Sequence, residues 1–280
     1  MTKRIVLCAD DYGQALSISS GIIDLIQRNR LSATSCMVNG DHWREQAMLL
    51  KPYQTQIDIG LHFNLTEGKP VSAAYRRKYG DSFFPLSEMM ARSMLRKLDK
   101  STLIKECEAQ IMLFHEVLGF MPHFIDGHQH IHQFPVIRDA VLANYETHLR
   151  AHRAYVRIAR EKISIKLDET VLNIKKLVIN NMGAAALKRC LKEKNIPYNQ
   201  SFAGIYLFAN AQSYGAYFRR FLQEVGDQGL IMCHPGYAVS GSLSQDAIAE
   251  ARAAEYQYLA SDQFIKDCEA AGNVVLSRFS

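Results

Sequence analysis

The chain has 280 residues, 48% of them hydrophobic, and a formal net charge of +5 at pH 7. This length and apolar content suffice for one large core, and the composition does not shift along the chain, so we expect residues 1–280 to form a single domain. The basic residues are scattered apart from short clusters, which argues against a nucleic-acid-binding protein.

Cysteine usage and hydropathy indicate the cellular setting. The six cysteines lie far apart, without a Cys-x-x-Cys pair, so we expect reduced, buried thiols. The first apolar run, residues 5–9, is too short for the core of a signal peptide, and no run approaches the ~18 apolar residues of a membrane helix. These features predict a cytoplasmic protein with no membrane or nucleic-acid partner.

Strands and helices are expected to alternate along the chain. Apolar runs typical of buried strands occupy residues 5–9, 33–38, 57–62, 123–127, 154–158, 204–208, 230–233 and 273–276. Helical periodicity or capping signals predict helices at 18–26, 41–50 with Asp41 as cap, 87–118 ending at Gly119 and 135–144 beginning at Pro135. Further helices are predicted with a face at 167–178 and an end near Gly183, in a second piece ending at 194, at 214–225, and through 271. Residues 64–85 and 239–244 are predicted loops, the first long enough to cover a site.

This alternation favours a (β/α) barrel, complete or distorted, over a doubly wound sheet. The position of the polar residues decides between the two. Those at the carboxyl ends of predicted strands are Asp10, Asp11, His62, Asp126, His128, Arg157 and His234. A barrel builds its active site at that end, so the sequence predicts a site there.

The densest group of potential metal ligands is residues 124–132, which read Phe-Ile-Asp-Gly-His-Gln-His-Ile-His. Its three alternating histidines would share one face if the strand continued and would diverge if it ended at Gly127. We therefore expect only one or two of them to bind metal, with His128 favoured over His130 and His132 because it lies nearest the strand end.

Asp10 and Asp11 would point to opposite faces of an extended strand, so both serve one site only if the chain turns there. Tyr12 and Gly13 make such a turn reasonable. Ordinary structural explanations also exist: a solvated turn for the aspartates, a core position for His62 and a simple His-Pro-Gly turn for His234. The functional interpretation of His234 is a general acid.

Two imidazoles and one carboxylate would leave positions for water and substrate, which is typical of a catalytic metal site. Such a ligand set suits Zn²⁺ and other transition metals more naturally than Mg²⁺. No Gly-rich phosphate loop and no Gly-x-Ser-x-Gly motif occur, so covalent catalysis by serine is disfavoured.

Four segments resemble the YdjC-like carbohydrate deacetylases in order and spacing. They are residues 9–13 (Ala-Asp-Asp-Tyr-Gly), 60–66 (Gly-Leu-His-Phe-Asn-Leu-Thr) with 68–70 (Gly-Lys-Pro), 122–135 and 232–236 (Met-Cys-His-Pro-Gly). The resemblance implies a distorted (β/α) barrel related to the polysaccharide deacetylases, and it is compatible with a homodimer. It also implies one divalent metal ion, Mg²⁺ or Zn²⁺, bound by Asp11, His62 and His128.

By the same resemblance Asp10 takes the place of the catalytic base, Arg157 orients Asp10 or binds substrate, and His234 matches the late histidine of the family. The resulting hypothesis is removal of an N-acetyl group from an amino sugar or short oligosaccharide, with a small carbohydrate as substrate. Two alternatives are a metal-dependent phosphoesterase on a similar barrel, which a two-metal site would support, and a non-catalytic sugar-binding protein.

Overall fold

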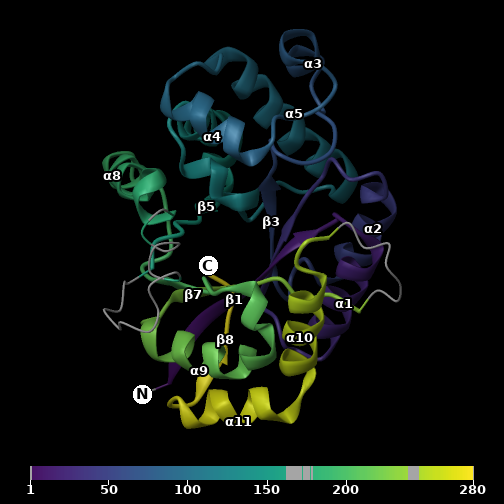
Figure 1. Cartoon of the computed structure of the whole chain (residues 1–280), viewed down its shortest axis with the longest axis vertical. Coiled ribbons are helices and arrows are strands. Elements are labelled where there is room, and N and C mark those ends of the chain that lie inside the picture. Colours follow the sequence, from purple (N-terminus) through teal and green to yellow (C-terminus); the bar gives the residue numbers. More distant parts are fainter. Residues whose placement is uncertain (1, 162–171, 173–176, 178, 239–245, 280) are drawn as a thin grey trace.

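A curled sheet of parallel strands lies at the centre of the computed structural model, which describes residues 2–161, 172, 177, 179–238 and 246–279 (Figure 1). The strands are β1 (Lys3–Tyr12), β2 (Ala33–Cys36), β3 (Asp58–Phe63), β4 (Phe124–Gly127), β5 (Tyr155–Val156), β6 (Phe202–Ala203), β7 (Gly229–Cys233) and β8 (Val274–Leu276). Their order is β5-β4-β3-β2-β1-β7-β6, with β8 paired to the beginning of β1. Parallel pairing throughout is what repeated β-α alternation predicts.

The two edges of this sheet meet. Val156 in β5 forms a parallel bridge with Tyr198, four residues before β6 begins. Beside it, the Asn199 side chain accepts from Ile158 N at 2.7 Å and donates to Ile158 O at 3.0 Å. The Asn199 side chain thus takes the place of backbone pairing next to this bridge. The sheet closes on itself here, and the expectation of a distorted (β/α) barrel is confirmed.

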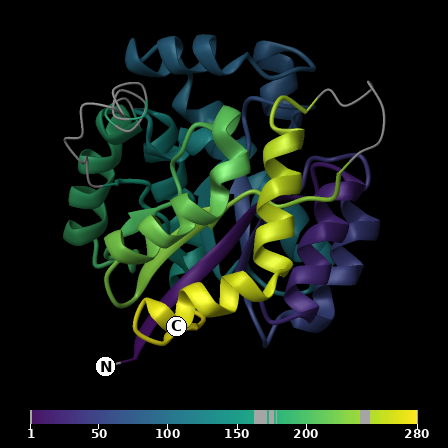
Figure 2. The same ribbon diagram turned by 60° about the horizontal axis from the view of Figure 1, so that its bottom comes forward.

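Helices surround the strands, and Figure 2 shows β1 running between them. The α-helices are α1 (Leu16–Gln27), α2 (Trp43–Leu50), α3 (Ala73–Tyr79), α4 (Leu86–Met94), α5 (Lys100–Leu118), α6 (Ile137–Asn144), α8 (Ala185–Glu193), α9 (Tyr214–Glu224), α10 (Ala249–Ala260) and α11 (Asp262–Ala270). Short 3₁₀ or π turns are η1 (Lys51–Tyr53), η2 (His128–Gln133), η3 (Tyr145–Leu149), η4 (Arg150–His152), η6 (Asn180–Ala184) and η7 (Phe208–Ser213). Among the described residues, no helix combines the length and apolar character that a membrane crossing needs.

The two faces of the sheet bury separate apolar clusters. Ile5, Leu7 and Ala9 belong to the larger cluster that also contains the buried helix faces, whereas Val6 and Cys8 belong to a smaller cluster inside the barrel. The alternation follows from the two-residue period of a strand. Residues in phase with Val6 and Cys8 therefore point into the barrel, and Asp10 is the next in that series.

Aromatic side chains fill the barrel interior below the site. Phe124 and Tyr155 stack with ring centroids 4.8 Å apart. The Phe124 ring lies directly over Gly60, where a Cβ atom would come within 2.5 Å of the ring carbons. The interior is thus closed by packed rings, and the polar residues of the candidate site lie above these rings, near the carboxyl ends of the strands.

Several predicted boundaries were wrong. The sixth strand lies at Phe202–Ala203 and not at residues 204–208, because Gly204 takes φ +127° and approaches Met232 O so closely that a Cβ there would stand 2.4 Å from it. The helix predicted at residues 41–50 begins at Trp43, after His42 rather than Asp41. Val136, with φ +66°, separates Pro135 from α6.

The region between β3 and β4 contains more helix than predicted. The expected loop at residues 64–85 includes α3, whose first turn is capped by Ser72 Oγ accepting from Tyr75 N at 3.0 Å. The helix expected at 87–118 is divided into α4 and α5, with Asp99 capping the second and Gly119 ending it at φ +86° as predicted. Most of the helix predicted at 167–178, and the loop at 239–244, fall outside the described residues.

Candidate metal and catalytic site

Asp10 and Asp11 face one cavity because the chain turns between them. Asp11 adopts φ +69°, and the register of β1 against β2 shifts between Ala9 and Tyr12. Such a bulge re-aims a side chain that would otherwise point to the opposite face. The required turn therefore exists, centred on Asp11 rather than on Tyr12 and Gly13, and both carboxylates line the same cavity.

His62 is held by the neighbouring strand. It pairs in register with Asp126, so the two side chains emerge on the same face of the sheet. His62 Nδ1 donates to Asp126 Oδ1 at 2.6 Å, and Ser35 Oγ donates to the same oxygen at 2.5 Å. The other ring nitrogen, Nε2, lies 3.3 Å from Asp11 Oδ1.

The three alternating histidines diverge, as expected if the strand ends at Gly127. The chain enters η2, in which Gln129 and His130 both adopt left-handed φ values. His128 Nδ1 donates to Asp11 Oδ1 at 2.9 Å, His130 lines the cavity, and the buried His132 donates from Nε2 to Arg157 O at 2.8 Å. The three rings thus occupy three different environments.

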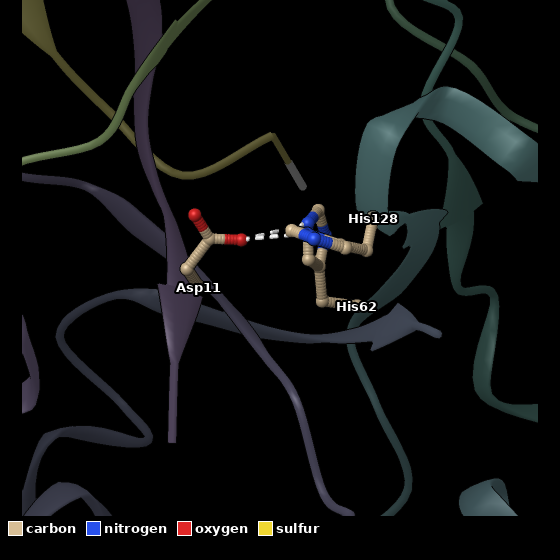
Figure 3. A group of neighbouring side chains, drawn as sticks. All are labelled: Asp11, His62 and His128. Carbon is tan, nitrogen blue, oxygen red and sulfur yellow. Dashed lines mark hydrogen bonds and ion pairs between the residues drawn. The ribbon is translucent and has the colours of Figure 1, made fainter. Parts of the chain in front are cut away.

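Asp11, His62 and His128 offer a carboxylate oxygen and two imidazole nitrogens within 4.8 Å of one another (Figure 3). All three residues are buried. In Figure 3 the two rings overlap in the view, and both point toward the Asp11 carboxylate; their centroids lie 5.4 Å apart and their planes are steeply inclined, at 73°. This donor set and convergence fit one divalent cation of the kind that prefers nitrogen and oxygen ligands.

The electrostatics of the site favour positive charge. Burial opposes the charged imidazoles, but Asp126 and Asp10 raise the pKa of His62 to about 10 and Asp11 raises the pKa of His128 to about 9. Burial likewise opposes the charged form of Asp11, yet Arg252 and His128 hold the pKa of Asp11 well below its usual range. Fixed carboxylates therefore attract a proton or a metal ion to this point.

Arg157 lies beneath the site and is fully buried. Its Nη1 and Nη2 donate to the two oxygens of Asp10 at 2.6 and 2.7 Å, and Nη2 also lies 2.9 Å from Asp126 Oδ2. The guanidinium is therefore shared between two buried carboxylates. It contacts Asp10 from the side opposite the cavity, and the residues that line the cavity do not include it.

His234 closes another wall, at the carboxyl end of β7. Its backbone N–H donates to Glu255 Oε2 at 2.5 Å, and the Tyr206 hydroxyl donates to Glu255 Oε1 at 2.6 Å. Burial lowers the pKa of His234 to about 4, so its imidazole is neutral near pH 7. The ring meets Phe208 edge to face, with centroids 5.5 Å apart.

The cavity that contains these groups has a volume of about 1180 Å³. Its polar wall holds Asp10, Asp11, His62 and His128. Apolar and aromatic side chains form much of the remainder, among them Leu86, Met90, Met182, Tyr206, Phe208 and Tyr237. A volume of this size accommodates a ligand larger than a single small metabolite.

Sequence reasoning assigned no role to several residues that contact the site: Gln14, Ser35, Glu67, Asp126, Arg252 and Glu255. A signal existed for Asp126, since aligning the third and fourth predicted strands places it beside His62. Glu67 directly follows a quoted motif. Arg252 and Glu255 lie on α10, and no local pattern connects that helix with β1.

A family model described as YdjC-like protein matches residues 4–270. A relative from Yersinia pestis (strain Pestoides F), named chitooligosaccharide deacetylase, is 27% identical over 85% of this chain and 83% of its own length. A relative from Xenopus laevis, named carbohydrate deacetylase, is 36% identical over 56% of this chain and 51% of its own length. The chain thus spans about half the length of that relative.

Among solved structures, a crystal structure from Enterococcus faecalis V583 superposes with a TM-score of 0.72 at 18% identity, covering 100% of this chain and 98% of the other. That protein is described as a cellobiose-phosphate cleavage protein. At this identity the likeness shows a common fold, whereas the family match extends over nearly the whole sequence. The chain belongs to the YdjC-like protein family.

Proposed function

We propose that this protein is a metal-dependent hydrolase that removes an N-acetyl group from an amino sugar or short oligosaccharide. The observation that carries the proposal is the convergence of Asp11, His62 and His128 beside a further carboxylate, Asp10, in one cavity. The names of the relatives from Yersinia pestis and Xenopus laevis support the substrate class.

Asp11, His62 and His128 would hold one divalent ion, Mg²⁺ or Zn²⁺. Such an ion supplies a Lewis acid that polarises an acetyl carbonyl and makes a water molecule more acidic. The nitrogen-containing ligand set favours Zn²⁺ or another transition metal over Mg²⁺.

Asp10 is proposed as the general base. It lines the cavity and would take a proton from the attacking water, while its bidentate contact with Arg157 fixes the direction of its oxygens. Because Arg157 is fully buried behind Asp10, we assign it the positioning of Asp10 rather than contact with substrate. Of the two roles expected for this arginine, its contacts favour the first.

His234 is proposed as the group that protonates the leaving amine. Because its imidazole is neutral near pH 7, His234 would pass to the amine nitrogen the proton that Asp10 has taken from the attacking water. Addition of water across the C–N bond then yields acetate and a free amine, with protons balanced. The Glu255 carboxylate fixes the His234 backbone for this step.

The cavity suits a carbohydrate because it combines a polar floor with aromatic walls. Tyr206, Phe208 and Tyr237 present ring surfaces of the kind that pack on the apolar faces of sugars. Its volume of about 1180 Å³ leaves room for more than one sugar unit. We therefore favour an oligosaccharide end or a short oligosaccharide over a polymer interior.

A phosphoesterase that clamps phosphate between two metals needs a second metal close to the first. Within the described residues, a second group of close ligand-type atoms is Cys8, Asp10 and Asp126. The Arg157 guanidinium already bonds both carboxylates of this group, so it leaves little reason for a second cation there. This contact favours the deacetylase over the phosphoesterase.

The test is acetate release from a panel of N-acetylated sugars, including chitobiose and longer oligomers, by protein loaded with Zn²⁺, Co²⁺, Mn²⁺ or Mg²⁺. We expect metal-dependent release that His62→Ala abolishes. Binding of the same sugars without release, with metal bound, would instead support a non-catalytic sugar-binding protein. The predicted homodimer and cytoplasmic location stay predictions, to be checked by light scattering and by cell fractionation.

A further inference from the structure

A closed ring of hydrogen bonds passes through two of the three proposed metal ligands. Five bonds of 2.7 to 3.0 Å join the side chains in the order Asp11, His128, Glu67, Gln14, Arg252 and back to Asp11. The members come from β1, η2, the segment after β3, the turn before α1, and α10. Segments far apart in the sequence therefore meet at this ring.

Arg252 occupies one oxygen of Asp11 and leaves the other facing the imidazoles, where a metal ion would replace the bond between Asp11 and His128. Arg252 Nη2 donates to Asp11 Oδ2 at 2.8 Å, while Asp11 Oδ1 faces both imidazoles. Arg252 is itself buried, and its Nε donates to Asp246 Oδ2 at 2.6 Å, so its position is fixed from two sides. Asp11 is thus presented as a ligand through Oδ1 alone.

The ring also decides which nitrogen of His128 faces the site. His128 Nε2 donates to Glu67 Oε1 at 3.0 Å, which leaves Nδ1 pointing at Asp11. His62 has the mirrored arrangement, with Nδ1 bonded to Asp126 and Nε2 facing Asp11. Each imidazole therefore has a carboxylate behind it, and such partners orient metal-bound histidines in proteins generally.

Gln14 connects the two halves of the ring. Its amide nitrogen donates to Glu67 Oε2 at 2.7 Å, and its amide oxygen accepts from Arg252 Nη2 at 2.9 Å. An amide suits this position because it carries both a donor for Glu67 and an acceptor for Arg252. A carboxylate at position 14 would face Glu67 and repel it. Gln14 thereby sets the position of Glu67, which is otherwise half-exposed.

We propose that Glu67 and Gln14 are positioning residues that fix His128 as an Nδ1 ligand of the metal. The inference rests on the proposed metal site of the enzyme, and it assigns roles to residues outside the ligand set. Because Glu67 holds His128 and Gln14 holds Glu67, the two residues act in series. Removing either should loosen the same imidazole.

The test measures Co²⁺ affinity by calorimetry and the visible absorption spectrum of the bound Co²⁺, independently of turnover. We expect Glu67→Ala to weaken Co²⁺ binding by about 10- to 100-fold and to shift the spectrum, as outer partners of metal ligands do. Glu67→Gln, which retains an oxygen for His128 Nε2, should restore part of the affinity. Glu45→Ala, which removes an exposed glutamate on α2, is the matched control and should change nothing.

Gln14→Ala should give a smaller loss than Glu67→Ala, and the double variant should lose little more than Glu67→Ala alone, because residues in series are not additive. Co²⁺ affinity and spectrum of Glu67→Ala equal to those of the unchanged protein would overturn the inference. Failure of the unchanged protein to bind Co²⁺ would overturn it together with the metal site. Absence of acetate release, with the Glu67 effect on Co²⁺ intact, would overturn only the proposed reaction.

Discussion

The two imidazoles of the candidate metal site are held by carboxylates in opposite surroundings. Behind His62 lies Asp126, whose side chain is fully buried and shared with Arg157. Behind His128 lies Glu67, whose side chain is 40% exposed and bonded to the neutral amide of Gln14. Buried charges interact strongly, and leaving one of them unpaired is costly. Exposed charges interact weakly, and leaving one unpaired costs little. The deep side of the site should therefore be tied to the stability of the fold, and the rim side mainly to metal binding.

The largest effect is expected from Asp10→Asn, on the deep side. The asparagine retains an oxygen for Arg157 but is a poor base, so kcat for acetate release should fall by about 100- to 10,000-fold. Co²⁺ affinity measured by calorimetry should stay within a few-fold of that of the unchanged protein. The exposed Asp81→Asn serves as the control. Full activity in Asp10→Asn with metal bound would remove Asp10 from the proposed mechanism.

Arg157→Met tests the deep side for stability. It removes the cation between the buried carboxylates of Asp10 and Asp126, and loss of one partner of a buried ion pair costs about 3–5 kcal/mol. Urea unfolding of the metal-free variant should show a decrease of that size. Arg44→Met, which breaks an exposed pair with Glu116, should cost at most about 1 kcal/mol. Equal losses in both variants would mean that the buried ion pairs of Arg157 stabilise the fold no more than an exposed pair does.

Patterns local to the chain could be predicted from the sequence, whereas contacts that form only in the fold could not. Most strand positions, the barrel and the polar residues of the candidate site followed from apolar runs that end in polar residues, a pattern local to the chain, whereas the choice of Asp11, His62 and His128 as ligands came from the family resemblance. The left-handed turn at Asp11 was foreseen only in general terms, because its cause is a bulge between β1 and β2. Gly204 ended the sixth strand early for a similar reason, since its close approach to Met232 exists only in the fold.

Non-local partners were the main omission. Arg252 reaches Asp11 from α10, and Glu255 on the same helix reaches the backbone of His234. Such contacts depend on how α10 packs beside α1 (Figures 1 and 2), which no periodicity in either helix encodes. Motifs identify the residues that could bind a metal, whereas the packing of distant elements determines which side chains hydrogen-bond to those residues.

Glu255 sharpens the comparison because it is as buried as Asp126 but its hydrogen-bond donors, Tyr206 and the His234 N–H, are neutral. Burial raises the pKa of Glu255 from 4.5 to about 7, whereas Arg157 and His62 lower the pKa of Asp126 against burial. Between pH 4.5 and 7 the folded protein therefore binds the Glu255 proton more tightly than the unfolded chain. The free energy of unfolding should fall with rising pH over this range, by roughly 3 kcal/mol from this group.

Urea unfolding at pH 5 and pH 8 checks this. Glu255→Gln, which cannot ionise, should show a flatter dependence on pH than the unchanged protein. Glu250→Gln, a substitution of an exposed glutamate on the same helix, should keep the original slope. The same slope in Glu255→Gln and the unchanged protein would assign the pH dependence to other groups.

The smallest effect is expected from Glu67→Ala on the stability of the metal-free protein. Glu67 is partly exposed, and water can replace its contacts with His128 and Gln14, so the free energy of unfolding should change by less than about 1 kcal/mol. Asp126→Ala, the equivalent change behind His62, should cost several times more because it leaves Arg157 with one buried partner fewer. Urea titrations of both variants in the presence of a chelator measure this difference. Comparable losses would mean that the rim carboxylate supports the fold as the deep one does, and that the division between stability and metal binding across this site is wrong.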